Sequence, residues 1–211
     1  MATLVLDHFT DADSTSLDAH TPDTRPGSNA WVEALGNWQI TGNKAVLAAL
    51  QGWAQAHINS GQANCTVSVN AKSTTAAAGM GKDVGLLVRW ASNGTYNDWW
   101  SIGVSAADDR FRIIEVNDGV SQTERAGAAV MIDTATVYAI SATLSGSTIT
   151  ATVDGGNQIS YASASMNQTS TIHGIIARET TDTLDDFLAA AGGAAAIGLP
   201  AGSLARMGVG I

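Results

Sequence analysis

Aromatic residues beside an arginine and an asparagine are the first candidate for chemistry in this chain. Tyr96, Trp99 and Trp100 follow Arg89, and Asn97 stands among them. Carbohydrate sites combine an aromatic face with a few hydrogen-bonding side chains, so this set could form a sugar-stacking platform. Neighbouring residues of a strand point to opposite faces, so we expect at most one of the two tryptophans in the core and the other exposed or in an interface. Core or interface packing is the favoured interpretation, and a glycan site is the alternative.

Carboxylates could do acid–base chemistry, but their spacing does not favour it. Retaining glycoside hydrolysis needs two carboxyl groups about 5 Å apart. The glutamates occur singly, as Glu33, Glu115, Glu124 and Glu179. The closest acidic group comprises Asp182, Asp185 and Asp186, beside a strand end and without a second glutamate nearby. The four histidines form neither a close pair nor a Ser/His/Asp order, so we predict a protein that is not an enzyme.

The cysteine content and the net charge exclude further classes. Cys65 is the only cysteine, so an internal disulfide framework and a multi-cysteine metal site are excluded. It alternates with Val67 and Val69, which predicts a buried thiol in a strand. The formal net charge of −9 repels phosphate backbones and anionic lipids, so we expect no nucleic-acid partner. The N-terminus lacks a basic region followed by a long apolar run, so we expect no signal peptide and synthesis in a cytoplasm.

The elements that must position these residues are strands. Short β-type runs alternate with Gly, Asn, Asp and Ser, and no convincing helical period appears up to about Phe187. The clearest pair is 138–144 and 148–153, joined by the turn Ser145-Gly146-Ser147, which predicts a hairpin. A further strand ends near Tyr161. Other expected strands are 3–9, 38–41, 44–47, 53–58, 64–72, 84–91, 98–105, 110–117, 121–126 and 172–179. So many short strands predict an all-β sandwich of two antiparallel sheets.

The C-terminal segment 188–211 differs from the rest of the chain. It is rich in Gly and Ala, and Pro200 and Arg206 interrupt it, so we do not expect a membrane span. We therefore divide the chain into a sandwich domain, 1–187, and an apolar arm, 188–211. The arm would bury its apolar groups on a copy of the same chain or on another subunit. Its candidate contact residues are Leu188, Ile197, Leu199, Leu204, Met207, Val209 and Ile211.

Two N-terminal segments resemble a known family. They are residues 6–23 (LDHFTDADSTSLDAHTPD) and 36–40 (GNWQI). They are similar to the opening of concanavalin-like (laminin-G-like) jelly-roll domains found in bacteriophage structural proteins. Residues 85–90 (GLLVRW), 96–100 (YNDWW), 111–116 (FRIIEV) and 182–187 (DTLDDF) continue the resemblance, which covers roughly residues 4–187. It implies a concanavalin-like jelly roll, and one such fold hosts many functions.

The resemblance also implies a calcium hypothesis. In that fold the first and last strands pair, which would bring Asp7 towards Asp185 or Asp186. Calcium requires six to eight oxygen ligands, including backbone carbonyls that a sequence does not reveal. We predict no other cofactor.

Taken together, these observations predict a non-enzymatic virion protein of a bacteriophage. It would be a capsid decoration, fibre or tail-associated subunit that assembles through its arm, located in the virion and partnered by other virion proteins or by copies of itself. The alternative is a carbohydrate-binding module that recognises a host surface glycan. These two predictions differ in the surface they use, because assembly requires the arm and glycan binding requires the region of Trp99 and Trp100.

Overall fold

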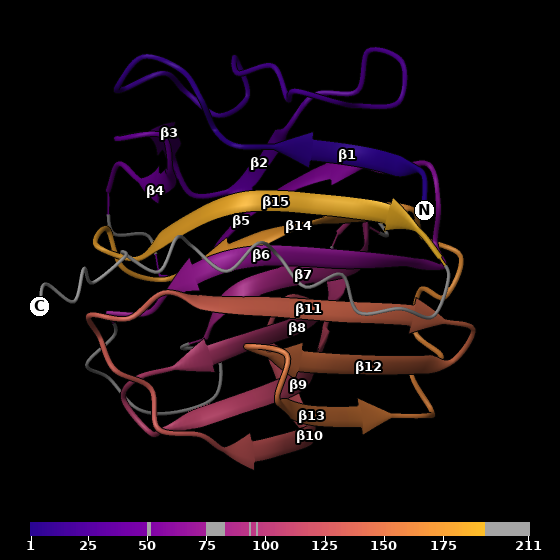
Figure 1. Cartoon of the computed structure of the whole chain (residues 1–211). Coiled ribbons are helices and arrows are strands. Elements are labelled where there is room, and N and C mark those ends of the chain that lie inside the picture. Colours follow the sequence, from indigo (N-terminus) through magenta and orange to yellow (C-terminus); the bar gives the residue numbers. More distant parts are fainter. Residues whose placement is uncertain (50–51, 75–82, 93, 96, 193–211) are drawn as a thin grey trace, which may run out of the picture.

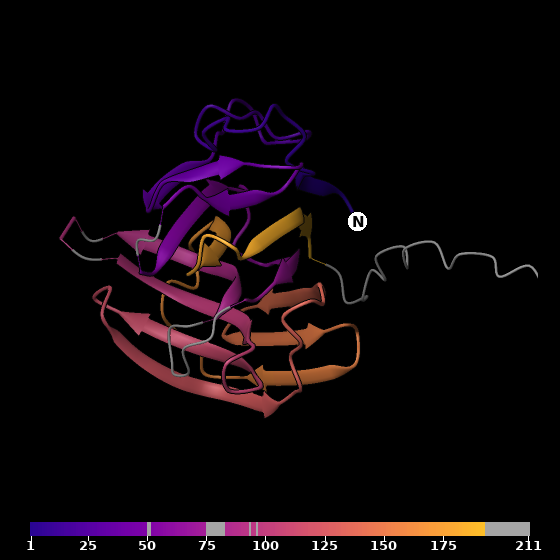
Figure 2. The same ribbon diagram turned by 90° about the vertical axis from the view of Figure 1, so that its left-hand side faces the viewer.

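The structure is a computed structural model that describes residues 1–49, 52–74, 83–92, 94–95 and 97–192. These residues form two antiparallel sheets, sheet A and sheet B. The two sheets lie against each other as two layers. Sheet A lies in front of sheet B in Figure 1, and the two layers are seen side by side in Figure 2. The predicted sandwich of antiparallel sheets is therefore confirmed.

Sheet A has the order β13-β12-β11-β6-β15-β4-β3, with β1 also paired to β15. Its strands are β1 (Thr3–Asp7), β3 (Trp38–Ile40), β4 (Ala45–Leu47), β6 (Cys65–Lys72), β11 (Tyr138–Ser145), β12 (Thr148–Val153), β13 (Asn157–Tyr161) and β15 (Thr183–Ala191). The expected hairpin is β11 and β12, with Leu144 opposite Ile149. Most strand predictions agree with the structure to within a few residues.

Sheet B has the order β10-β9-β8-β7-β14-β5-β2. Its strands are β2 (Val32–Leu35), β5 (Ala54–Asn59), β7 (Val84–Ser92), β8 (Asn97–Ser105), β9 (Arg110–Asn117), β10 (Ser121–Ala129) and β14 (Ile172–Ala177). The sequence did not predict β2, an edge strand of four residues that carries the exposed side chains of Val32 and Leu35. A strand this short and this exposed has no clear apolar alternation to identify it.

The main core lies between the two sheets. Along β8, Trp100, Ile102 and Val104 point into it, and Ile140 and Ala142 of β11 enter it from sheet A. Each fully buried apolar side chain of this size stabilises the fold by about 1.5–3 kcal/mol. This alternation leaves the other residues of each strand on an outer face, and the outer face of sheet B carries the candidate site.

The last strand extends further than expected. β15 continues to Ala191, and Leu188 pairs with Leu6 of β1 and with Ser68 of β6. The predicted boundary after residue 187 is therefore wrong, because residues 188–191 complete a strand that is paired on both sides. The remaining predicted arm residues, from Ile197 to Ile211, lie outside the described residues, so assembly through the arm stays a prediction. The described residues contain no helix that is long and apolar enough to cross a bilayer.

Candidate functional site

Trp99 and Trp100 point to opposite faces of sheet B, as their adjacency predicts. Trp100 lies in the main core, where its Nε1 donates to the carbonyl of Met166 (3.1 Å) and its ring lies 5.7 Å from that of Tyr161. Trp99 lies on the outer face but is only 1% exposed. The expectation that one of the two is exposed or in an interface is therefore not met, because a second apolar cluster buries Trp99. Trp100 belongs to the fold and not to a binding platform.

Arg89 is not a ligand-facing residue either. It is fully buried at a register shift in β7 and has a φ of 54°. Its guanidinium donates to the carbonyl of Gly146 (2.7 Å) and to that of Ala164 (3.4 Å), so it ties β7 to two segments across the sandwich. Asn97 begins β8 and is partly buried, whereas Tyr96 lies outside the described residues.

The second apolar cluster covers the outer face of sheet B. The rings of Trp53 and Trp99 meet edge to face, with centroids 5.2 Å apart, and Trp90 packs beside them. Trp99 is on β8 and Trp53 directly precedes β5, and these two strands are separated by β7 and β14. The two rings therefore meet above the middle strands, over Leu87 of β7 and Ile176 of β14.

Polar side chains share this outer face with the three tryptophans. Gln55 and His57 alternate with core residues of β5, and Ser101 and Ser105 alternate with core residues of β8. We name the whole set the tryptophan face: Trp53, Gln55, His57, Trp90, Trp99, Ser101 and Ser105. All these residues are buried except Trp90, which is partly buried. The face is thus an aromatic layer with hydroxyl, amide and imidazole groups inside it.

Seven buried side-chain atoms of the tryptophan face have no hydrogen-bond partner in the described part of the chain. Among the described residues, eight buried side-chain nitrogen or oxygen atoms have no hydrogen-bond partner. Seven of them belong to the tryptophan face: Nε1 of Trp53, Trp90 and Trp99, Oε1 of Gln55, Nε2 of His57, and Oγ of Ser101 and Ser105. The remaining atom is Nε of Arg89. Folded proteins satisfy the large majority of such atoms, so seven on one face require an explanation.

His57 is uncharged at neutral pH. Burial lowers the pKa of its imidazole from 6.5 to about 4, because the surroundings disfavour the charged form. The ring stacks on Trp90 with centroids 4.1 Å apart. His57 therefore offers a neutral polar ring to its surroundings.

Charged residues at the β9–β10 side of this face are paired with one another. Arg112 contacts Asp83 at 2.8 Å and Asp108 at 2.9 Å, and Arg110 bonds to Glu124. Arg112 lies opposite Gly103, between Ser101 and Ser105 along β8. These charges are thus compensated inside the protein, and the seven atoms of the tryptophan face that lack partners among the described residues belong to uncharged groups.

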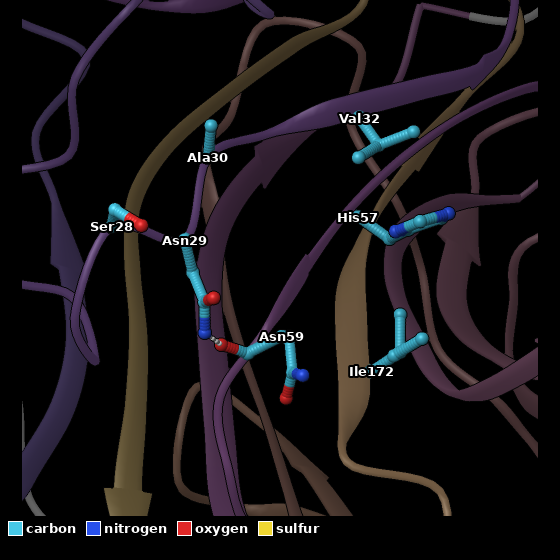
Figure 3. A pocket seen from close by; sticks show the side chains of 7 residues that line it. All are labelled: Ser28, Asn29, Ala30, Val32, His57, Asn59 and Ile172. Atoms are coloured by element: carbon cyan, nitrogen blue, oxygen red, sulfur yellow. Dashed lines mark hydrogen bonds between the residues drawn. The ribbon is translucent and has the colours of Figure 1, made fainter.

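A pocket of about 340 Å³ adjoins the tryptophan face at the edge formed by β2 (Figure 3). Its lining residues are Ser28, Asn29, Ala30, Val32, His57, Asn59 and Ile172. Val32 pairs with His57 across β2 and β5, and Asn59 pairs with Ile172 across β5 and β14. His57 belongs to both the pocket and the tryptophan face, so the two form one continuous surface.

The calcium hypothesis fails at Asp7. The first and last strands do pair, with Asp7 opposite Phe187, but the Asp7 carboxylate is fully buried. It accepts hydrogen bonds from Nε1 of Trp31 (2.6 Å) and the backbone N–H of Phe9 (2.7 Å), and it lies 2.9 Å from Nε2 of His20. This carboxylate thus holds the N-terminal loop in place.

Asp185 and Asp186 serve other contacts. Asp186 accepts from the amide of Asn70 (2.8 Å), and Asp185 lies 3.8 Å from Nζ of Lys44. In the described part of the chain, no group of three or more His, Cys, Asp or Glu residues is arranged to hold a metal ion. These carboxylates and Asp7 therefore do not converge as the hypothesis requires.

Cys65 and His173 form a buried pair that is not suited to nucleophilic chemistry. Their Sγ and Nε2 atoms lie 3.4 Å apart. The backbone N–H of Arg89 donates to Nδ1 of His173, so the ring proton is on Nε2, which donates to the carbonyl of Gln62. Burial raises the pKa of the thiol to about 12 and lowers that of the imidazole to about 4. Both groups are neutral, and the predicted buried thiol is confirmed.

Sequence reasoning identified Trp99 but missed its partners on the tryptophan face. The signal was present in the alternation of residues 53–58, where Trp53, Gln55 and His57 are interleaved with Ala54, Ala56 and Ile58. A strand with a core on one side is expected to place water-compatible residues on the other. A tryptophan, an amide and an imidazole on that second side mark it as a candidate binding surface.

No family model and no curated protein sequence matches this chain. Solved structures do match it. The carbohydrate-binding module CBM66 from Bacillus subtilis is 15% identical, and the match covers 76% of this chain and 95% of that one with a TM-score of 0.60. A second similar structure is domain 4 of AbnA, an extracellular GH43 arabinanase from Geobacillus stearothermophilus, in complex with arabinotriose. It is 12% identical, and the match covers 90% of this chain and 93% of that one with a TM-score of 0.56.

A third similar structure is the exoplasmic/lumenal domain of VIP36 in its Ca²⁺/Man2-bound form. It is 11% identical, the match covers 84% of this chain and 86% of that one, and the TM-score is 0.52. At these identities the likeness establishes the fold. The described residues therefore form a concanavalin-like jelly-roll sandwich, as the sequence resemblance implied.

Proposed function

We propose that this domain binds a neutral glycan on the tryptophan face of sheet B. The observation that carries this proposal is the gathering of seven unpaired buried polar atoms and three tryptophan rings on one outer face. An unpaired buried polar atom costs about 1–3 kcal/mol. Seven such atoms are a large cost for a domain whose net stability is on the order of 5–15 kcal/mol.

A sugar ring has the chemistry that this face lacks. Its C–H faces stack on aromatic rings, and its hydroxyl groups both donate and accept hydrogen bonds. The hydroxyls of Ser101 and Ser105 can do either, the indole N–H groups donate, and Oε1 of Gln55 accepts. A polyhydroxylated ligand can therefore satisfy every kind of unpaired atom on the face.

Binding requires a rearrangement of two rings. Trp53 and Trp99 meet edge to face, and the unpaired polar atoms of the same face are buried as well. We expect the glycan to separate these rings, which selects an open conformation of the face. Trp53 is 9% exposed and Trp90 is partly buried, so these two rings offer the first contact.

The known activities of similar structures support this proposal. CBM66 is named as a carbohydrate-binding module, and the AbnA domain is in complex with arabinotriose. Both resemble this chain over most of its length.

The experiment is an array of neutral and acidic glycans, followed by calorimetric titration of the glycans that bind. Trp53→Ala and Trp99→Ala should each weaken binding at least about tenfold, because truncating a central aromatic contact costs about 2 kcal/mol or more. Intrinsic tryptophan fluorescence should also change on addition of the glycan, since the Trp53–Trp99 contact opens.

Trp100→Phe is the matched control. Trp100 is also a buried tryptophan of β8 but points into the main core, so this variant should bind the glycan as the unmodified protein does, at a temperature where both are folded. The proposal is wrong if no neutral glycan binds, or if Trp53→Ala and Trp99→Ala bind as tightly as the control.

A further inference from the structure

The pocket at the β2 edge differs in character from the tryptophan face. Its walls combine the apolar side chains of Val32 and Ile172 with the carboxamides of Asn29 and Asn59 (Figure 3). Val32 is 50% exposed, so this wall is accessible to solvent. A volume of about 340 Å³ falls in the range of small-ligand sites, about 300–1,000 Å³.

Polar groups of the pocket are only partly used by the protein. Nδ2 of Asn29 donates to the carbonyl of Asn59 (2.7 Å). Oδ1 of Asn59 accepts from the N–H of Gly61 (2.9 Å) and the hydroxyl of Thr171 (2.8 Å). These bonds fix both carboxamides, and within the described part of the chain they leave Oδ1 of Asn29 and Nδ2 of Asn59 without partners. The pocket therefore presents one fixed acceptor and one fixed donor.

His57 connects the pocket to the tryptophan face. Its ring is a wall of the pocket, stacks on Trp90 at 4.1 Å, and carries an unpaired Nε2. A ligand that lies on Trp90 and continues towards β2 must pass this ring. The side chain is 6% exposed, so its position is set by the protein and not by solvent.

None of the seven lining side chains is charged at neutral pH. An acidic sugar would bring a carboxylate or sulfate into a pocket whose lining holds no cation, and such a charge would lose water without gaining a partner. The chemistry of the lining selects a neutral group with both apolar C–H surface and hydroxyls.

We propose that this pocket is a second subsite, which takes an uncharged sugar unit of the same glycan and uses His57 as the residue shared with the tryptophan face. This inference rests on the proposed function. The ligand is therefore an oligosaccharide, and its affinity rises when one unit enters the pocket.

The experiment is a calorimetric titration of the full chain with neutral malto-, cello-, xylo- and manno-oligosaccharides of increasing length, with oligogalacturonides as the acidic counterpart. We expect one neutral series to gain about tenfold in affinity at the length that reaches the pocket. Oligogalacturonides should bind at least about tenfold more weakly than that series.

Two variants test the pocket directly. Ala30→Trp fills it from an exposed position, and the length-dependent gain should disappear while the shortest binding sugar keeps its affinity. His57→Phe keeps a ring against Trp90 but removes the ring nitrogens, and binding of the longer sugar should fall about tenfold. Since His57→Phe also removes an unpaired buried atom, its melting temperature should stay the same or rise, which separates lost binding from unfolding.

Ala135→Trp is the matched control, because Ala135 is an exposed residue in the segment that follows β10, and β10 is the edge strand of sheet B opposite β2. If a neutral series binds but Ala30→Trp and His57→Phe retain the full gain, the subsite is wrong and the proposed function survives. Equal binding of oligogalacturonides would overturn the neutral class. If no probe binds and the ring nitrogen resonances of His57 do not shift, both the subsite and the proposed function are wrong.

Discussion

His57 shows at the scale of one residue how function and stability oppose each other on this surface. Its imidazole is buried and neutral, stacks on Trp90 and leaves Nε2 unpaired. A hydrophobic residue at this position would leave no buried ring nitrogen unpaired, so the folded state would be more stable. Under the proposed function, a glycan would satisfy the unpaired ring nitrogen of His57.

The pH dependence of stability should reveal this burial. The pKa of His57 is about 4 in the folded protein and 6.5 when the ring is free, so the unfolded state binds the proton first. This contribution to the unfolding free energy is complete above pH 6.5 and is lost as the pH falls towards 4, by about 3 kcal/mol. Urea unfolding at pH 7 and at pH 4 should therefore show a smaller drop in His57→Phe than in the unmodified protein. Equal drops would show that His57 is protonated freely in the fold.

At the scale of elements, alternation along each strand decides which side chains lie on the tryptophan face. The close approach of β14 to β5 fixes the position of the β5 residues of this face. Gly174 of β14 pairs with His57 of β5. A Cβ atom at Gly174 would lie 2.0 Å from the carbonyl oxygen of Ala56 and 2.6 Å from Cα of His57. Both contacts are with backbone, so neither neighbour can rotate away.

Gly174→Ala should therefore separate β14 from β5 and lower the unfolding free energy by about 3 kcal/mol. Gly156→Ala is the control, since a Cβ there has nothing within 4 Å and its φ is not positive. That change should stay within about 0.5 kcal/mol. Thermal and urea unfolding of the two variants test this, and a similar small effect of both would show that the strands tolerate the methyl group.

Strand prediction succeeded where alternation was long and failed where it was short. The strands Arg110–Asn117 and Thr148–Val153 were predicted to the residue. The strand Val32–Leu35 was missed, although it forms the edge at which the pocket lies. All four residues of this strand are exposed or only partly buried, so no alternation of buried and exposed residues marks it.

At the scale of the whole molecule, the first and last described strands pair inside sheet A. Residues 188–190 pair with β1 on one side, and residues 188–191 pair with β6 on the other. A chain that ends at Phe187 should therefore be strongly destabilised, whereas a chain that ends at Gly192 should melt within a few degrees of the full chain. The measurement is the melting temperature of each truncated chain. Equal melting temperatures would show that the strand pairs of residues 188–191 contribute little to stability.

The chain that ends at Gly192 also tests the assembly prediction. If segment 193–211 is an assembly arm, light scattering should show an oligomer for the full chain and a monomer for the truncation. Two monomers would contradict self-association through the arm. The virion location and the virion partners depend on this segment and stay predictions.

The sequence by itself determined the fold class, most strands and the face of each strand that meets the core. These are local properties, because the period of two in a strand depends only on neighbouring residues. It also identified Trp99 as a residue to test. It could not show that Trp53 shares one surface with Trp90 and Trp99, because Trp53 lies beside β5, which reaches the consecutive strands β7 and β8 only through its long-range pairing with β14. Only the tertiary structure decided which strands lie side by side, and with that which aromatic rings and unpaired polar atoms form a site.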